Sequence, residues 1–167
     1  MRRFNIVFIL LFSLFFWSCK DKTTNQDINS PSNEVNDFED LTFIDVNGNE
    51  VKLNHDRYSF INLWATWCKP CVNEMPSLKS LKDKVGNNMD FYFASYESPQ
   101  KVKRFSDIIG IDIPFYSYND NNIPKEMTTQ VLPLTIIVKN GKVIYSHSGA
   151  TQWHTGPVYD SIKSIIN

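Results

Sequence analysis

Cysteine and histidine are scarce in this chain of 167 residues, and basic side chains are not in excess over acidic ones. It has three cysteines, too few for a scaffold held by several disulfides. Lys and Arg number 17 against 18 Asp and Glu, so the composition indicates no basic surface for nucleic acid. His55, His147 and His154 show no paired ligand spacing, and structural zinc requires four ligands. The sequence therefore predicts no metal, no cofactor and no nucleic-acid partner.

The chain also lacks an apolar run long enough to cross a bilayer, which takes about 20 residues. Its N-terminal run, Ile6–Trp17, follows Arg2 and Arg3 and stops shortly before Cys19. A short apolar segment behind a positively charged start is typical of a secretory signal peptide. We predict that residues 1–18 form such a peptide and that the domain works in the cell envelope, facing the periplasm or the exterior.

The cysteine at the end of this run resembles the lipobox of bacterial lipoproteins, whose thiol takes a lipid and becomes the mature N-terminus. The resemblance implies lipidation of Cys19 and attachment to a membrane. Phe16 and Trp17 are bulkier than is usual there, so a plain signal peptide and an uncleaved anchor stay open. Residues 20–37 are polar and contain Ser-Pro-Ser, so we expect 19–37 to form a flexible tether.

From Phe38 onward, apolar residues recur with strand and helix spacing in turn, which predicts an α/β domain over residues 38–167. We expect a β-hairpin within 41–53, strands at 58–64 and 89–97, a strand or loop at 112–120, and a hairpin over 133–148. We expect helices at 70–85, 98–110, 122–130 and 155–167. This order predicts a mixed central sheet flanked by helices on both faces.

The segment Trp67-Cys68-Lys69-Pro70-Cys71 lies where a predicted strand gives way to a helix. The partial positive charge of a helix N-terminus stabilises a thiolate, which is the nucleophile in disulfide exchange. Lys69 either adds to this effect or is an ordinary surface charge. A spacing of three places Cys71 one helical turn from Cys68, within reach of a disulfide. We expect Cys68 to attack a partner disulfide and Cys71 to resolve the mixed disulfide.

The sequence NLWATWCKPC, residues 62–71, resembles the thioredoxin-fold signature and, more narrowly, the TlpA/ResA-like extracytoplasmic thiol-disulfide oxidoreductases. The resemblance implies a thioredoxin fold with an N-terminal β-hairpin and an inserted helical segment. Thioredoxin has a titratable Asp where this chain has Asn62. The resemblance assigns the proton-handling role to Glu74, three residues after Cys71. A solvent-facing helical Glu is the alternative.

The resemblance also implies a cis peptide bond before Pro133 and a position for this proline against the cysteine motif. The backbone of Leu132 would then bind an extended partner segment by strand addition. Trp67 would form an apolar docking rim, with Lys69 and Pro70 completing the motif surface. Trp64 is interpreted as a core residue, and Pro76 is expected to kink its helix.

By resemblance, we expect the protein to be a monomer that reduces disulfides of exported proteins, with apocytochrome c as one candidate. Electrons would come from a membrane thiol donor. A thiol oxidase or isomerase, a copper-binding or redox-sensing module, and a purely structural disulfide remain alternatives. A peroxidase is disfavoured because residues 60–67 contain Thr66 but no proline.

Overall fold

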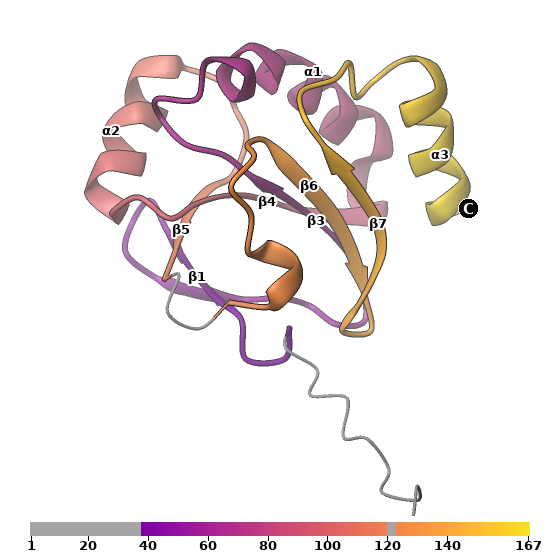
Figure 1. Ribbon diagram of the computed structural model, residues 1–167, viewed down its shortest axis with the longest axis horizontal. Helices are drawn as coiled ribbons and strands as arrows, with labels where there is room; N and C mark the ends of the chain where they lie inside the picture. The colour runs from indigo at the N-terminus through magenta and orange to yellow at the C-terminus, as the bar shows by residue number, and fades with distance from the viewer. Residues whose placement is uncertain (1–37, 120–122) are drawn as a thin grey trace, which may run out of the picture. The chain divides into compact units, whose positions relative to one another are not determined.

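The computed structural model describes residues 38–119 and 123–167, so the predictions for 1–18, 19–37 and Cys19 lie outside the described residues. The elements, shown in Figure 1, are β1 (Thr42–Asp45), β2 (Glu50–Lys52), β3 (Tyr58–Leu63), α1 (Lys69–Val85), η1 (Gly86–Asn88), β4 (Met89–Ser95), α2 (Pro99–Ile109), β5 (Phe115–Tyr118), η3 (Lys125–Met127), β6 (Leu134–Lys139), β7 (Lys142–Ser148) and α3 (Gly156–Ile166). The elements η1 and η3 are short 3-10 turns.

These strands form one open mixed sheet in the order β2-β1-β5-β4-β3-β6-β7. The central strands β3, β4 and β5 run parallel, and the other neighbouring pairs are antiparallel. The predicted N-terminal hairpin is β1–β2 and the predicted C-terminal hairpin is β6–β7. Asn140 and Gly141 join β6 to β7 with φ of 50° and 70°, the backbone that an Asn-Gly hairpin turn adopts.

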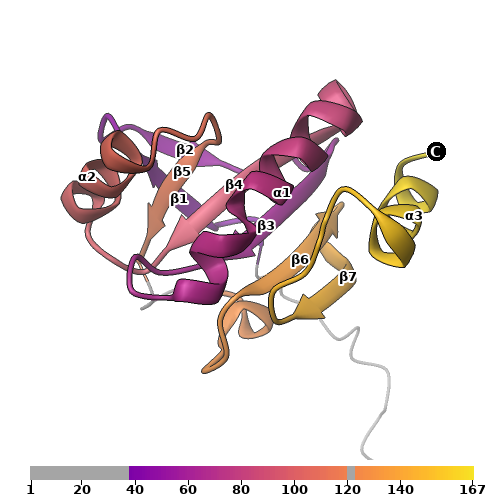
Figure 2. The ribbon, with the colours of Figure 1, turned by 90° about the horizontal axis from the view of Figure 1, so that it is seen from above.

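The three α-helices share one face of the sheet, as Figures 1 and 2 show. Helices α1 and α2 link neighbouring parallel strands, β3 to β4 and β4 to β5. Both right-handed crossovers step the same way across the sheet, so they place their helices on the same side. Helices on both faces were expected. The opposite face carries the turn η3 instead, because the connection from β5 to β6 steps back across the sheet.

The core under the helices holds α1 firmly against the sheet. Met75, Leu78 and Leu81 of α1 are almost fully buried among the aromatic rings of the central strands. Each buried leucine contributes about 2 kcal/mol relative to an exposed one. Cys68 and Cys71 belong to the same cluster. The packing of α1 therefore fixes where the cysteine motif lies.

Several element ends differ from the predicted ones. Strand β4 ends at Ser95, two residues early, so Tyr96 and Glu97 lie in the loop before α2. Ser98 is the N-cap of α2, as predicted, although its side chain makes no capping hydrogen bond. The helix expected over 122–130 is reduced to η3. Pro76 lies inside α1, and the kink itself stays a prediction.

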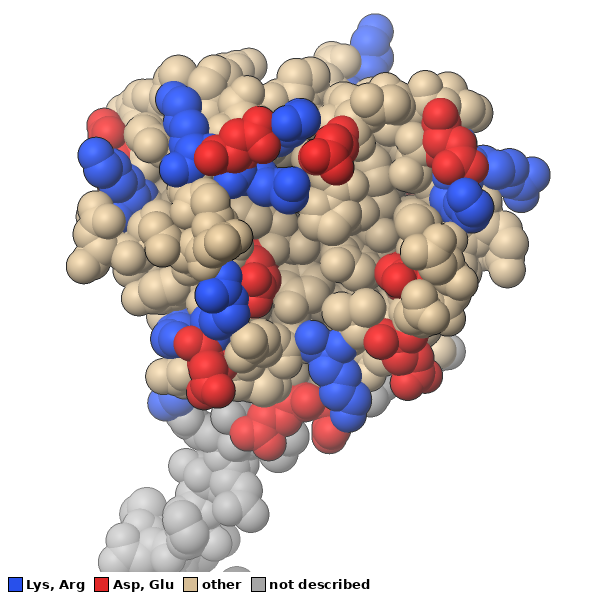
Figure 3. All heavy atoms as spheres, turned by 180° about the vertical axis from the view of Figure 1, so that it is seen from behind, with Lys and Arg blue, Asp and Glu red and all other residues tan. Residues whose placement is uncertain are grey.

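Charges of both signs are interspersed on the face of the molecule in Figure 3. This mixture agrees with the near balance of 17 basic and 18 acidic side chains. Within residues 38–119 and 123–167, no helix combines the length and the apolar character needed to cross a membrane.

Candidate functional site

Cys68 and Cys71 form a disulfide at the N-terminus of α1. The two Sγ atoms are 2.02 Å apart and the Cα atoms 5.3 Å apart. Cys68 is the N-cap residue, and its sulfur accepts a hydrogen bond from the backbone N–H of Cys71 at 3.3 Å. Cys68 is 4% exposed and Cys71 is 1% exposed. The prediction that the two cysteines lie within reach of a disulfide at a helix N-terminus is confirmed. The division of roles between the two sulfurs stays a prediction.

The loop before Cys68 follows the carboxyl end of β3, one of the three parallel strands. The N–H of Trp64 donates to the carbonyl of Ala94 on β4, and the N–H of Cys68 donates to the carbonyl of Ala65. Trp64 is fully buried between Phe105 and Phe115, as expected for a core residue. The motif thus lies at the edge of the sheet where open α/β folds bind their ligands.

Glu74 is buried directly after the motif rather than facing solvent, so the solvent-facing alternative is wrong. Its side chain is 2% exposed. Asn62 Nδ2 donates to Oε1 at 3.0 Å, and Oε2 accepts from the Thr151 N–H at 3.1 Å and from Trp153 Nε1 at 2.8 Å. Asn62 Nδ2 also donates to Thr135 Oγ1 at 2.9 Å. The carboxylate therefore joins α1 to β3 and to the segment between β7 and α3.

Burial raises the pKa of Glu74 above its ordinary value, against the opposing hydrogen bonds from Trp153, Thr151 and Asn62. Burial disfavours the charged carboxylate, whereas the three N–H donors favour it. A buried carboxyl group whose pKa is raised takes up a proton more readily than an exposed one. The proton-handling role of Glu74 stays a prediction.

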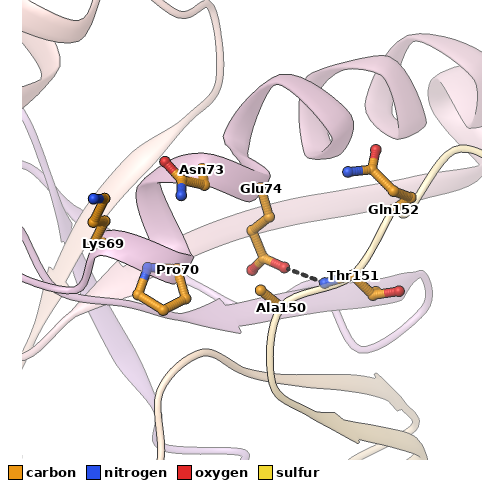
Figure 4. A pocket seen from close by; sticks show the side chains of 7 residues that line it. All are labelled: Lys69, Pro70, Asn73, Glu74, Ala150, Thr151 and Gln152. Carbon is orange, nitrogen blue, oxygen red and sulfur yellow. Dashed lines mark hydrogen bonds between the residues drawn. The ribbon is translucent and has the colours of Figure 1, made fainter.

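A hollow of about 570 Å³ lies over Glu74 and is drawn in Figure 4. Its lining residues are Lys69, Pro70, Asn73, Glu74, Ala150, Thr151 and Gln152. Figure 4 shows Glu74 extending from α1 toward the segment before α3, with Lys69 and Pro70 at the first turn of the helix. Both motif residues between the cysteines are exposed at this hollow. We call it the Glu74 hollow.

A second hollow, of about 440 Å³, lies beside the motif between Trp67 and the segment before β6. It is lined by Trp67, Tyr96, Tyr118, Ile123, Met127, Thr128, Thr129, Gln130 and Leu132, and we call it the Trp67 hollow. The bond between Leu132 and Pro133 is cis, as predicted. The structure thus brings two of the predicted docking residues, Trp67 and Leu132, to one concave surface.

A buried carboxylate that sequence reasoning missed supports the loop carrying Trp67. Glu97 accepts from the Thr66 N–H at 2.6 Å and from Thr66 Oγ1 at 2.9 Å, and it pairs with Lys101 at 2.5 Å. Burial would raise the pKa of Glu97, but the hydrogen bonds from Lys101 and Thr66 outweigh it and leave the pKa lowered. Tyr96 Oη accepts from Trp67 Nε1 at 3.0 Å. The position of Glu97 just after β4 could have indicated this, because β3 and β4 are parallel and end at the same edge.

The histidines have structural contacts and do not gather with the cysteines. The His147 ring packs edge-on against Trp153 with centroids 5.3 Å apart. His154 Nδ1 lies 3.3 Å from Ser77 Oγ. Among residues 38–119 and 123–167, no three His, Cys, Asp or Glu side chains are arranged to hold a metal ion.

Known proteins resemble this chain over the domain just described. It is 31% identical over 111 residues to the thiol-disulfide oxidoreductase ResA of Geobacillus thermodenitrificans, a match that covers 62% of this chain and 63% of ResA. The chain therefore spans less than two thirds of the length of this curated relative.

Two solved structures have the same fold. StoA of Bacillus subtilis aligns with a TM-score of 0.57 at 17% identity, covering 66% of this chain and 87% of StoA. The exposed lipoprotein thioredoxin of Streptococcus pneumoniae aligns with a TM-score of 0.58 at 15% identity, covering 75% of this chain and 96% of that protein. These likenesses confirm the predicted thioredoxin fold. The Redoxin family model matches residues 31–162, so the chain belongs to the Redoxin family.

Proposed function

We propose that this protein is a thiol-disulfide oxidoreductase that reduces disulfides of exported proteins. The observation that carries the proposal is the Cys68–Cys71 disulfide at a helix N-terminus, with the buried carboxylate of Glu74 one turn further along the helix. A disulfide that closes so short a loop stabilises the fold little, which disfavours a purely structural role. The similarity to ResA supports the same activity.

The reaction runs in two exchange steps. The Cys68 thiolate attacks one sulfur of the partner's disulfide, and the other partner sulfur leaves as a thiolate with the bonding electron pair. Cys71 then passes its proton to the Glu74 carboxylate and attacks the Cys68 sulfur. The mixed disulfide breaks, the partner leaves with its second thiolate, and the Cys68–Cys71 disulfide forms. Two electrons have moved to the partner, and a dithiol donor, itself oxidised to a disulfide, supplies two more to regenerate the Cys68–Cys71 dithiol.

The Trp67 hollow is the proposed docking site for the partner. Trp67 is 64% exposed and follows Thr66 directly before the nearly buried Cys68, so an apolar side chain of this hollow faces solvent next to the motif. An extended segment lying between Trp67 and Leu132 would bring its disulfide to Cys68, with backbone hydrogen bonds as in strand addition.

We further propose that the protein is a lipoprotein of the cell envelope, exported by residues 1–18, lipidated at Cys19 and tethered by 19–37. The similarity in fold to an exposed lipoprotein thioredoxin supports this location. The donor of electrons would then be a membrane thiol protein, and apocytochrome c is one candidate among the exported substrates. The domain is proposed to act as a monomer.

Trapping of mixed disulfides tests the proposed activity. Cys71→Ser removes the resolving thiol, so we expect Cys68 to remain bonded to its partner in a complex that is stable without reductant. Cys68→Ser should trap no partner and should abolish reduction of insulin. Trapping by neither variant, with insulin reduction at the wild-type rate in both, would contradict the enzyme assignment.

A further inference from the structure

The segment 149–155, between β7 and α3, is bonded to α1 at several points. The Thr151 N–H and Trp153 Nε1 donate to Glu74 Oε2 at 3.1 and 2.8 Å. The Trp153 N–H donates to Ser77 Oγ at 2.5 Å, and Lys84 Nζ donates to the His154 carbonyl at 2.9 Å. The first of these contacts is drawn in Figure 4. The segment therefore presents two donors to one oxygen of the buried carboxylate.

Trp153 is held so that its indole N–H can point only one way. The side chain is 0% exposed. Its ring packs edge-on against Phe60 at 5.3 Å and against His147 at 5.3 Å, on two different strands. A ring packed on two sides cannot turn its N–H toward water when the charge of Glu74 changes. The donor is thus preorganised for a carboxylate at this position.

Among the described residues, the groups that donate hydrogen bonds to the Glu74 oxygens are all neutral. Asn62 donates to Oε1, and Thr151 and Trp153 donate to Oε2. The titratable groups around them are the Cys68–Cys71 pair on the same helix, Lys69 along the hollow, His147 behind the indole and His154 at Ser77. The only hydrogen bonds to Glu74 within the described part of the chain come from the three neutral donors.

We propose that Trp153 is a positioning residue for disulfide exchange, whose indole N–H orients the Glu74 carboxylate and sets the pH at which it takes up the proton of Cys71. This inference rests on the proposed function and deepens it. The Trp153 hydrogen bond is the largest of the influences that lower the pKa of Glu74, ahead of those from Thr151 and Asn62. Without the Trp153 hydrogen bond, the pKa of Glu74 should rise further, so the carboxylate should take up its proton at a higher pH.

The test is Trp153→Phe, which keeps an aromatic ring in the core and removes the N–H. Trp64→Phe is the matched control, because Trp64 is equally buried and its Nε1 has no hydrogen-bond partner in the described structure. The Glu74 carboxyl carbon is titrated by NMR in the oxidised protein, with Glu74→Gln identifying its signal. The rate at which Cys71 resolves a mixed disulfide is measured over the same pH range in single turnovers with insulin.

We expect Trp153→Phe to raise two midpoints by about one pH unit each, that of the Glu74 titration and that of the pH profile of the resolving rate. This is the effect of losing one charge-assisted hydrogen bond, and Trp64→Phe should change neither midpoint. An unchanged Glu74 midpoint in Trp153→Phe, with normal wild-type insulin reduction, overturns the inference and leaves the proposed function standing. A wild type that reduces no disulfide overturns both. If Trp153→Phe does not fold, benzothienylalanine at position 153 keeps the bicyclic ring and lacks only the N–H, and the same outcomes decide.

Discussion

At the scale of single residues, the proposed mechanism gives Glu74 the role that a buried aspartate has in thioredoxin. Asn62 cannot titrate, yet it donates to Glu74 and to Thr135, so the amide orients the acid on the neighbouring helix. The family resemblance predicted Glu74, which stands three residues after Cys71. It did not predict Trp153 and Thr151, because a donor more than 70 residues away becomes a neighbour only through the fold.

Glu74→Gln should slow the resolving step by about 10²-fold while leaving the first attack by Cys68 nearly unchanged, because only Cys71 needs a proton acceptor. Rapid-mixing kinetics with a disulfide substrate across pH measures the two steps separately. Glu50→Gln, on the exposed strand β2, is the control and should change neither step. A resolving rate equal to wild type at every pH would remove Glu74 from the mechanism.

At the scale of elements, the side chain of Glu97 holds together the loops after β3 and β4, a contact that the apolar pattern of the strands alone did not predict. The apolar alternation predicted both strands, but it extended β4 over Tyr96 and Glu97 and gave no reason for a buried acid there. The Glu97 carboxylate accepts hydrogen bonds from Thr66 on the loop after β3 and forms an ion pair with Lys101 on α2. The helix predicted over 122–130 is only the short turn η3, because its three residues make a single turn between Pro124 and Thr128.

Glu97→Gln should lower the free energy of unfolding by about 1–2 kcal/mol at pH 7, because it removes the charge that accepts from Thr66 and Lys101. The lowered pKa of Glu97 means that its contribution is present above the unfolded value near 4.5 and is lost as pH falls through the folded value. Urea unfolding of wild type and Glu97→Gln at pH 7 and at pH 3 gives the free energy of unfolding of each protein.

The difference in the free energy of unfolding between Glu97→Gln and wild type should be smaller at pH 3 than at pH 7. Asp107→Asn breaks an exposed pair with Lys103 on α2 and serves as the control, with an expected change below about 0.5 kcal/mol. A Glu97→Gln protein as stable as Asp107→Asn at pH 7 would show that the loop contact contributes nothing.

At the scale of the whole molecule, the pattern of strands and helices was enough to predict the mixed sheet and its hairpins. The distribution of helices on its faces was not, because that depends on the direction in which each connection crosses the sheet. The spacing of Cys68 and Cys71 at a predicted helix N-terminus indicated the redox pair, and the family resemblance predicted the cis bond before Pro133. The Trp67 hollow required the fold to bring residues 67, 96 and 132 together.

Replacement of Cys19 tests the proposed attachment to a membrane. Cys19→Ser should move the protein from the membrane fraction to the supernatant, because the proposed lipid would be its anchor. Cys71→Ser also removes one cysteine but should leave the protein with the membranes. Retention of Cys19→Ser in the membrane fraction would indicate that the apolar run itself is the anchor. Immunoblots of fractionated cells give the distribution.

The reduction potential of the Cys68–Cys71 pair tests the proposed direction of electron flow most directly. Equilibration of the protein with glutathione or dithiothreitol buffers, followed by alkylation of free thiols, gives the potential. A disulfide reductase predicts a value near that of thioredoxin, about −270 mV. A value near that of DsbA, about −120 mV, would contradict the reductase and make the protein an oxidant of thiols.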